Sequence, residues 1–217
     1  MTVIGEFPKD TSFRVEVTER PRGLSAIHEP GCIAAIWRRQ PLPEFQSWID
    51  TLHPDFLPRG RVVLRPEQVR EAVFHFCEAA GTPDCADRTR LIDDTAALAY
   101  IFGGLMRTPF LRLRINVGAG DAERNSDLDA VAARLACTYR GAETRYGSSS
   151  KGGVTQPICT VPTGTPILLR GNLWPETPRL GLLQRLSFKE HTHETRLTLA
   201  LDPVFDPDER PHHTRMH

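Results

Sequence analysis

The stretch FLRLRINV, residues 110–117, marks the point at which this chain changes its structural pattern. Apolar residues alternate along it with arginine and asparagine, which is the pattern of a β-strand with one buried face. In the residues before it, apolar side chains recur every three or four positions, as they do in an amphipathic helix. The sequence therefore predicts helices before residue 110 and β-structure after it.

Three helices are predicted in the first half of the chain from this spacing. Their ranges are 45–52, which follows a short apolar strand at 32–37, then 66–80, and then 87–106. Pro66 suits the first turn of the second helix, because its missing N–H costs nothing there. Gly81 is expected to end the same helix.

Five further strands are predicted between clusters of glycine, proline and serine. They are Val131–Tyr139, Val154–Val161, Pro166–Arg170, Leu180–Ser187 and Arg196–Leu201. Short strands at even spacing favour a barrel or a sandwich. The polar segment 147–153 is predicted to be an exposed loop, and the tail from Asp206 is predicted to lie outside the core.

The composition excludes several classes of function. The 217 residues are 40% hydrophobic, and 27 basic residues balance 27 acidic ones. A neutral balance gives no electrostatic reason to bind nucleic acid or an anionic membrane, so a small molecule is the expected partner. The sequence has no stretch of about 18 apolar residues and no typical leader, which predicts a cytoplasmic protein. Its five widely spaced cysteines predict buried thiols rather than a disulfide framework.

The chain resembles DUF1826, a bacterial family of unknown activity. The resemblance rests on five blocks that occur in the family's order and spacing and span most of the chain. These blocks are Ala35–Arg39, Leu111–Arg114, Arg134–Gly141, Leu169–Pro175 and Arg196–Leu199.

The resemblance implies an α/β (α+β) fold in which N-terminal helices pack on a C-terminal double-stranded β-helix. This core is the jelly-roll, or cupin-like, core of the iron and 2-oxoglutarate oxygenases. We therefore expect a single domain over residues 1–217. Its expected parts are a mixed helical support region at 1–109, a jelly roll at 110–205 and a tail at 206–217.

The resemblance also implies an iron site, because family members carry a His-x-Asp pair and a distal histidine. Counted from the Arg134 block, the pair falls on Asp127 and Asp129, and the distal histidine falls on Gln184. The separation, 184 − 127 = 57 residues, suits the two ends of a jelly-roll metal site, but neither imidazole is in place. Two carboxylates and an amide suit magnesium or calcium better than iron. We therefore expect no cofactor, with a divalent metal and 2-oxoglutarate or another carboxylate as the alternative.

Asp127 and Asp129 allow two further interpretations. On a strand they would face the same way, and as candidate catalytic residues one of them could act as a general base. The plainer interpretation is a polar turn with solvated carboxylates. His191 and His193 have a spacing that could complete a metal site with the two aspartates. Their polar surroundings are, however, typical of an exposed hairpin connection.

Arg196 and Thr198 are the candidate ligand-binding residues, together with Gln184. They would lie on one face of the last strand, 196 − 184 = 12 residues after the position of the missing histidine. The resemblance to 2-oxoglutarate oxygenases implies that this arginine and its hydroxyl partner clamp a ligand carboxylate. The alternative is an arginine paired with an acidic neighbour inside the barrel.

The leading functional hypothesis is a divergent oxygenase-like jelly roll that binds a small carboxylate-bearing ligand without standard iron chemistry. The second is an enzyme of altered mechanism, descended from an oxygenase-like ancestor. The family also resembles proteins whose genes lie beside those of zinc-homeostasis GTPases. This implies a third alternative, an accessory protein of metal homeostasis. The sequence does not indicate a protein partner.

Overall fold

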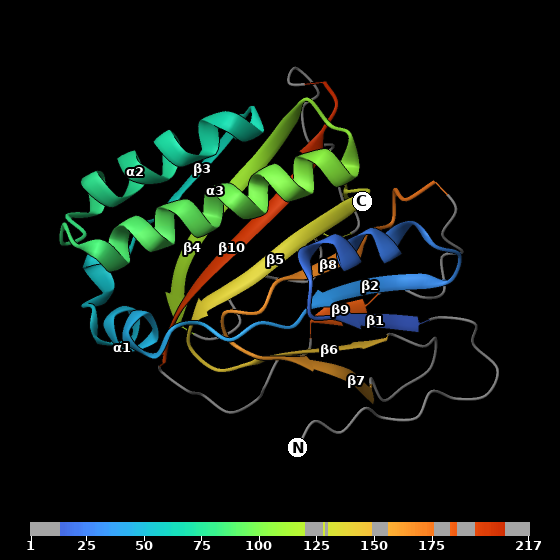
Figure 1. Cartoon of the computed structure of the whole chain (residues 1–217), viewed down its shortest axis with the longest axis horizontal. Coiled ribbons are helices and arrows are strands. Elements are labelled where there is room, and N and C mark those ends of the chain that lie inside the picture. Colours follow the sequence, from blue (N-terminus) through green and yellow to red (C-terminus); the bar gives the residue numbers. More distant parts are fainter. Residues whose placement is uncertain are drawn as a thin grey trace, which may run out of the picture.

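The structure is a computed structural model, and it describes residues 14–119, 128, 130–148, 156–175, 183–185 and 194–206. Within these residues the chain forms three α-helices and ten strands (Figure 1). The helices are α1 (Pro43–Thr51), α2 (Val69–Ala80) and α3 (Ala86–Met106), with 3-10 helices at Pro21–His28, Pro54–Phe56 and Pro66–Gln68. The strands are β1 (Arg14–Thr18), β2 (Cys32–Trp37), β3 (Gly60–Leu64), β4 (Phe110–Ala119), β5 (Ala133–Arg140), β6 (Thr144–Ser148), β7 (Gln156–Val161), β8 (Ile167–Arg170), β9 (Leu183–Arg185) and β10 (Thr195–Val204).

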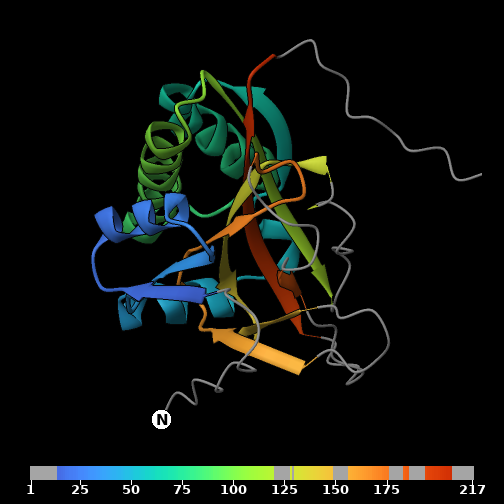
Figure 2. The same ribbon diagram turned by 90° about the vertical axis from the view of Figure 1, so that its right-hand side faces the viewer.

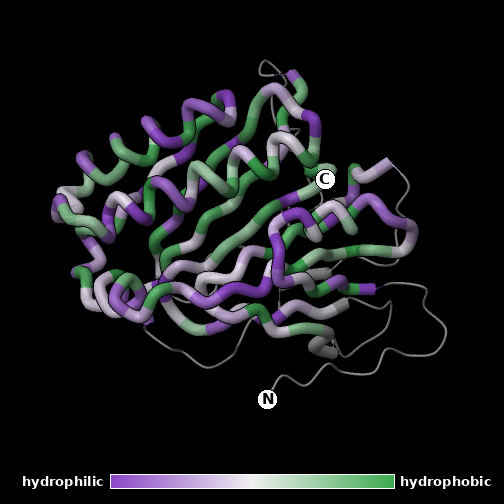
Figure 3. Tube along the Cα trace, in the orientation of Figure 1, coloured by the Kyte–Doolittle hydropathy of each residue, from purple (hydrophilic) through white to green (hydrophobic). Residues whose placement is uncertain are grey.

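The helices begin and end where the sequence provides boundary signals. α1 begins at Pro43, and α2 follows a 3-10 turn that begins at Pro66, so both prolines lie where no backbone N–H is needed. Gly81 ends α2 in a left-handed conformation with a φ of 66°. Hydrophilic and hydrophobic positions alternate along the turns of α2 and α3 (Figure 3), as the spacing predicted.

The strands form two sheets. The large sheet has the order β1-β2-β8-β5-β10-β4-β3, and the small sheet has the order β7-β6-β9. From β5 onward the chain passes from one sheet to the other: β5, β8 and β10 belong to the large sheet, and β6, β7 and β9 to the small one. This is the connectivity of a jelly roll. The predicted fold class, helices packed on a jelly-roll core, is confirmed.

The large sheet has two faces with different coverings. α2 and α3 lie on one face, which we call the outer face (Figure 2). The core on this side joins the sheet residues Leu113, Leu135 and Leu199 to Leu98 and Phe102 of α3. We call the opposite face the inner face.

A second, smaller core lies between the two sheets. Ile36, Ala136 and Ile167 on the inner face pack with Tyr146 of β6 and Val161 of β7. These inner-face residues belong to β2, β5 and β8. The small sheet therefore packs against that half of the large sheet, and the inner face along β10 and β4 belongs to neither apolar cluster.

Some strands differ from the sequence prediction. β1 and β3 were not predicted; they are the two edge strands of the large sheet, and their half-exposed residues give a weak pattern. The first 109 residues thus supply strands as well as helices. The exposed loop predicted from residue 147 is wrong at its first two positions, because Gly147 and Ser148 belong to β6 and Gly147 is buried. The rest of that segment and the tail after Asp206 lie outside the described residues.

None of the helices in the described part of the chain is long and apolar enough to cross a membrane. All five cysteines are free thiols, and Cys32, Cys77 and Cys137 are buried, as predicted. Burial raises the pKa of the Cys137 thiol to about 12.

Candidate functional site

The inner face of β4, β10 and β5 carries a group of charged side chains. Alternation places Arg112 and Arg114 on this face, because Leu111 and Leu113 are fully buried on the other one. This confirms the prediction made from the stretch at 110–117. Asp202 of β10 lies directly opposite Arg112 in the register of the two antiparallel strands.

Two arginines bind this aspartate and two more lie near them, and we call these five residues the arginine cluster. Its members are Arg61, Arg112, Arg114, Arg134 and Asp202. Asp202 is 1% exposed, and its Oδ1 accepts a 2.6 Å hydrogen bond from Nε of Arg134. Its Oδ2 accepts bonds from Nη2 of Arg114 at 2.9 Å and from Nη2 of Arg134 at 3.1 Å. Both carboxylate oxygens are therefore occupied.

Arg112 has a different environment from its two neighbours. Its guanidinium is partly buried and makes no hydrogen bond or ion pair with any other residue in the described part of the chain. Burial lowers the pKa of this guanidinium; the Asp202 carboxylate opposes the shift, and the other three guanidiniums of the cluster add to it. This side chain therefore lies near both the Asp202 carboxylate and three other guanidiniums.

A second group lies at the beginning of β10, and we call it the Arg196 site. It consists of Arg196, Thr198, Thr138 and Thr144. The Arg196 guanidinium donates to the carbonyl oxygen of Ala142 at 2.7 Å, and to the hydroxyls of Thr144 at 2.8 Å and Thr138 at 3.4 Å. All three acceptors are neutral oxygens.

The turn between β5 and β6 is shaped to lie against Arg196. Gly141, at the start of this turn, has a φ of 96°. A Cβ at this position would lie 2.8 Å from Cγ of Arg196, so only glycine combines this backbone angle with this close approach. The turn thereby brings Ala142 and Thr144 within reach of the guanidinium.

Thr198 completes the Arg196 site. It pairs in register with Thr138 of β5 and is 9% exposed. Among the described residues its hydroxyl has no hydrogen-bond partner, whereas the hydroxyls of Thr138 and Thr144 lie 3.1 Å apart. A guanidinium beside a hydroxyl is an arrangement that can bind a carboxylate.

The structure brings together only some of the predicted site residues. Arg196 and Thr198 are neighbours on β10, as predicted. Gln184 lies in β9 opposite Gly147 of β6, and its side chain is not described. The positions of Asp127, Asp129, His191 and His193 lie outside the described residues, so their predicted roles as catalytic residues or metal ligands remain predictions. Within the described residues, no three His, Cys, Asp or Glu side chains form a group that could hold a metal ion.

The described residues around Asp127 and Asp129 are anchored to the end of β8. The backbone N–H of Asn172 donates to Leu128 at 3.0 Å, and that of Leu173 donates to Val131 at 3.1 Å. Gly171 allows this contact, because a Cβ there would lie 2.0 Å from the carbonyl oxygen of Val131. The glycine in the family block Leu169–Pro175 thus has a packing role.

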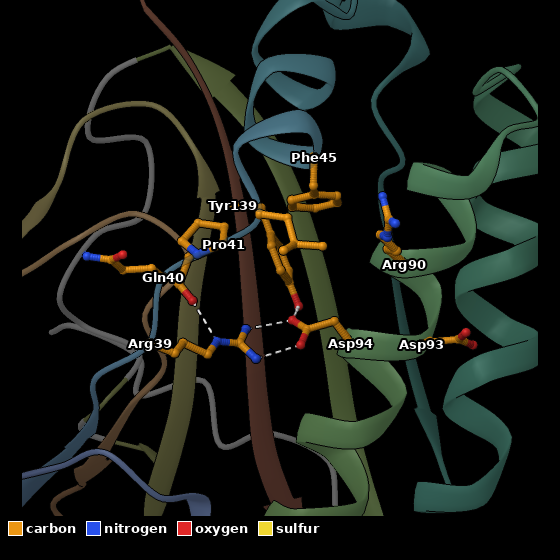
Figure 4. A pocket seen from close by; sticks show the side chains of 10 residues that line it. Arg39, Gln40, Pro41, Phe45, Arg90, Asp93, Asp94 and Tyr139 are labelled. Atoms are coloured by element: carbon orange, nitrogen blue, oxygen red, sulfur yellow. Dashed lines mark hydrogen bonds and ion pairs between the residues drawn. The ribbon is translucent and has the colours of Figure 1, made fainter.

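A cavity of about 360 Å³ lies on the other side of the large sheet, and the sequence did not predict it. Figure 4 shows that Pro41 and Phe45 lie on one side of it, and Arg90 and Asp93 on the other. Arg39 and Asp94 face each other across its base. The cavity is formed by the connection from β2 to α1, by α3 and by the end of β5.

The base of this cavity is an internally satisfied ion pair. Arg39 donates to both oxygens of Asp94, at 2.5 and 2.6 Å, and the Tyr139 hydroxyl donates to Oδ2 at 2.7 Å. Nε of Arg39 donates to the carbonyl oxygen of Gly164 at 2.8 Å. These bonds tie together β2, β5, α3 and the turn before β8. The donors and acceptors of this group therefore satisfy each other, as they do in a structural ion pair.

Comparisons with known proteins agree with this architecture. The profile of the family described as "Protein of unknown function (DUF1826)" matches residues 18–202. No curated protein sequence matches the chain. Among solved structures, a dioxygenase for auxin oxidation from Arabidopsis thaliana, in a binary complex with 2-oxoglutarate, is similar with a TM-score of 0.54 at 13% identity. The similarity covers 91% of this chain and 94% of that one.

Two more distant structures are of the same kind. The dioxygenase for auxin oxidation from rice has a TM-score of 0.46 at 12% identity, covering 88% of this chain and 83% of that one. An oxidoreductase of the 2OG-Fe(II) oxygenase family from Burkholderia pseudomallei has a TM-score of 0.40 at 11% identity, covering 87% of this chain and 94% of that one. At these identities the likeness shows the fold alone.

Proposed function

Since this chain belongs to the DUF1826 family of proteins of unknown function, we propose that it binds a small carboxylate-bearing molecule between its two sheets. The binding group is the Arg196 site, and the family resemblance adds Gln184 as a further candidate residue. A carboxylate would accept from the Arg196 guanidinium and from the hydroxyl of Thr198, because charged acceptors form stronger bonds with a guanidinium than neutral oxygens do.

The observation that carries this proposal is the placement of Arg196 beside Thr198 on the inner face. The hydrogen bonds to the carbonyl of Ala142 and the hydroxyl of Thr144 hold the guanidinium at the junction of β5, β6 and β10. The site thus lies at an edge of the space between the sheets. A preorganised guanidinium loses little side-chain entropy when it binds a ligand.

The fold supports a ligand of this class. The Arabidopsis protein that shares this architecture was solved with 2-oxoglutarate, a small dicarboxylate. That likeness does not assign the ligand of this chain, because sites differ among proteins of one fold. It does make 2-oxoglutarate the first probe to use.

We further propose that binding does not involve standard iron chemistry. The argument is the donor set that the family resemblance assigns to the metal position, namely Asp127, Asp129 and Gln184. Iron(II) in such oxygenases needs two imidazoles and one carboxylate, whereas two carboxylates and an amide favour hard cations. The residues present therefore do not fit iron.

The ligand proposal is tested by titration calorimetry of the full chain with 2-oxoglutarate, succinate and acetate. We expect binding of at least one of them, and a loss of tenfold or more in affinity for Arg196→Gln, which removes a charge-assisted contact. Arg38→Gln is the matched control, because Arg38 is exposed at the end of β2. Equal binding by the Arg196 and Arg38 variants would contradict the proposal.

The iron proposal has its own test. Elemental analysis of the purified protein should find well under one iron per chain. One tightly held iron per chain that disappears in Asp129→Ala would show that the metal site is functional, and the proposal would then be wrong.

A further inference from the structure

The cavity on the outer side of the large sheet lies apart from the Arg196 site, and we call it the outer cavity. Its base, formed by Arg39, Asp94 and Tyr139, is on the face of the sheet that α3 covers. Thr138, which binds Arg196, precedes Tyr139 on β5, and alternation directs their side chains to opposite faces. The outer cavity therefore needs an explanation of its own.

We propose that the outer cavity binds a neutral aromatic small molecule that carries one hydroxyl or N–H group. The ring would pack against Leu42 and Phe45, and the polar hydrogen would be donated to Oδ1 of Asp94. The volume of about 360 Å³ lies at the lower end of the range of small-molecule sites, roughly 300–1,000 Å³, which suits a small ring compound. This proposal does not depend on the carboxylate site at Arg196.

The apolar wall of the outer cavity favours an aromatic ligand. Pro41, Leu42 and Phe45 form this wall, where the connection from β2 enters α1 (Figure 4). The Phe45 ring meets the ring of Tyr139 edge to face, with 6.4 Å between their centroids, so a ligand ring can extend an existing aromatic pair. Leu42 is 53% exposed, and a ring that covers it removes apolar surface from water.

The base of the outer cavity offers a hydrogen-bond acceptor. Among the described residues, Oδ2 of Asp94 accepts bonds from Arg39 and Tyr139, whereas Oδ1 accepts only one, from Nη1 of Arg39. A carboxylate oxygen can accept two hydrogen bonds, so Oδ1 keeps one acceptor position. The Asp94 side chain is 28% exposed, so a ligand can reach it. The matching ligand therefore carries a donor.

The charges of the lining favour a neutral ligand. Two arginines and two aspartates line the cavity, namely Arg39, Arg90, Asp93 and Asp94. Their charges sum to 2 − 2 = 0, and each of the four has an ion-pair partner at 2.9 Å or less. A charged ligand would lose its hydration and would compete with a pair that is already formed. A neutral donor can bind without breaking any of these pairs.

The experiment uses the full chain and p-cresol as the probe, because p-cresol is a small neutral ring with one hydroxyl. An NMR titration measures its affinity. The matched ligand is p-xylene, in which a methyl group of similar size replaces the hydroxyl. We expect p-cresol to bind, and p-xylene to bind at least fivefold more weakly, because a hydrogen bond to a charged acceptor is stronger than one between neutral groups.

Variants of two exposed leucines locate the binding. Leu42→Ala removes part of the apolar wall and should weaken p-cresol binding by about fivefold. Leu173→Ala is the matched control, because Leu173 is also exposed, at 62%, and does not line the cavity. Both variants should fold, because substitutions of exposed side chains cost little stability.

A third variant separates this cavity from the carboxylate site. Arg196→Gln should bind p-cresol as well as wild type does. The anion p-toluate is titrated into the same variant, so that binding of its carboxylate at the Arg196 site does not contribute. In this variant p-toluate should bind more weakly than p-cresol, because the cavity lining has no net charge to attract it.

Several results would overturn the proposal. Absence of p-cresol binding, wild-type affinity in Leu42→Ala, or an equal loss in Leu173→Ala would show that the outer cavity is not the site. Equal affinity for p-xylene would exclude the hydrogen bond to Asp94, and tighter binding of p-toluate would exclude a neutral ligand. Tighter binding of N-acetyltyrosinamide than of p-cresol would show that the cavity takes a tyrosine side chain of a partner protein instead.

Discussion

The large sheet carries an arginine and aspartate group on each side, and the two groups are built differently. On the outer side, one guanidinium meets one carboxylate: Arg39 bonds to both oxygens of Asp94, and Tyr139 donates a further bond. On the inner face, two guanidiniums share Asp202 while Arg112 lies beside them without a described partner. The outer carboxylate thus binds one arginine, and the inner carboxylate binds two.

The two groups also differ in burial, because the Asp202 side chain is 1% exposed and the Asp94 side chain is 28% exposed. A balanced pair joins elements that are distant in sequence, here the end of β2 with α3 and β5. A buried carboxylate that two arginines share should matter more for stability, because removing its charge affects two buried guanidiniums at once. The predictions below test whether the two groups really differ in this way.

The largest effect is expected when the inner carboxylate is neutralised. Asp202→Asn leaves the buried guanidiniums of Arg114 and Arg134 without their shared charge, and we expect the free energy of unfolding to fall by about 3–5 kcal/mol. Urea denaturation followed by circular dichroism measures this change. The control is Asp55→Asn, whose side chain is 82% exposed and should have almost no effect. A loss below about 1 kcal/mol would mean that Asp202 does not hold the cluster together.

The corresponding change on the outer side should cost less. Asp94 is 28% exposed, so water can partly replace its bonds, and Asp94→Asn is expected to lower the free energy of unfolding by about 1–3 kcal/mol. Tyr139→Phe, which removes only one of the bonds, should cost about 1 kcal/mol. The same denaturation experiment ranks the variants. A larger loss of unfolding free energy in Asp94→Asn than in Asp202→Asn would show that the outer ion pair contributes more to stability than the inner one.

A third prediction concerns the turn that holds Arg196. The Gly141→Ala variant would place an alanine at a positive φ, with its Cβ against Arg196. We expect the free energy of unfolding to fall by about 1–2 kcal/mol. Binding at the Arg196 site should weaken as well, because the guanidinium must move. Gly104→Ala is the matched control: a Cβ there meets nothing within 4 Å, and alanine in an exposed helix should stabilise the chain by up to about 1 kcal/mol. Unchanged ligand affinity in Gly141→Ala would show that the turn does not position Arg196.

The smallest effect is expected in a thiol labelling experiment, which compares the reactivity of one cysteine in each core without any substitution. Burial raises the pKa of Cys137 in the outer core, and of Cys159 beside the inner core, to about 12. At pH 8 only about one thiol in ten thousand is then the reactive thiolate, so neither should react with a disulfide reagent in the native protein. Cys85 and Cys159 are both partly exposed, so Cys85 serves as the internal reference for access of the reagent. Labelling of Cys159 as fast as that of Cys85 would show that its pKa is not raised by burial.

Local patterns predicted most of the fold. The helical spacing before residue 110 and the alternation after it correspond to α1, α2, α3 and β4 within a few residues. The edge strands β1 and β3 were missed, because they are short and together contain only one buried residue, which gives a weak period. Glycines and serines made residues 147–153 look like a loop, whereas Gly147 pairs with β7 and β9. Pairing with neighbouring strands outweighed the local preference there.

The candidate sites were predicted less completely. The spacing of Arg196 and Thr198 indicated one face of one strand, and their positions on β10 agree. The partners of Arg196 could not be predicted, because Thr144 reaches it through the turn at Gly141, which has a positive φ, and Thr138 reaches it through the register of β5 with β10. The arginines of the stretch at 110–117 were expected on one face, but no pattern indicated that Asp202 would lie between Arg114 and Arg134.

By itself, the sequence determined which side chains share a face, because the period of two residues is a local property of a strand. It determined the order of helices and strands and the neutral overall charge for the same local reasons. Only the tertiary structure decided which faces meet. The antiparallel register of β10 with β4 and β5 brings Asp202 to arginines 88 and 68 residues away, and the packing of α3 brings Asp94 to Arg39, 55 residues away. Such contacts depend on strand pairing and helix packing over long distances, and these are selected by burial of the whole core rather than by any short stretch of residues.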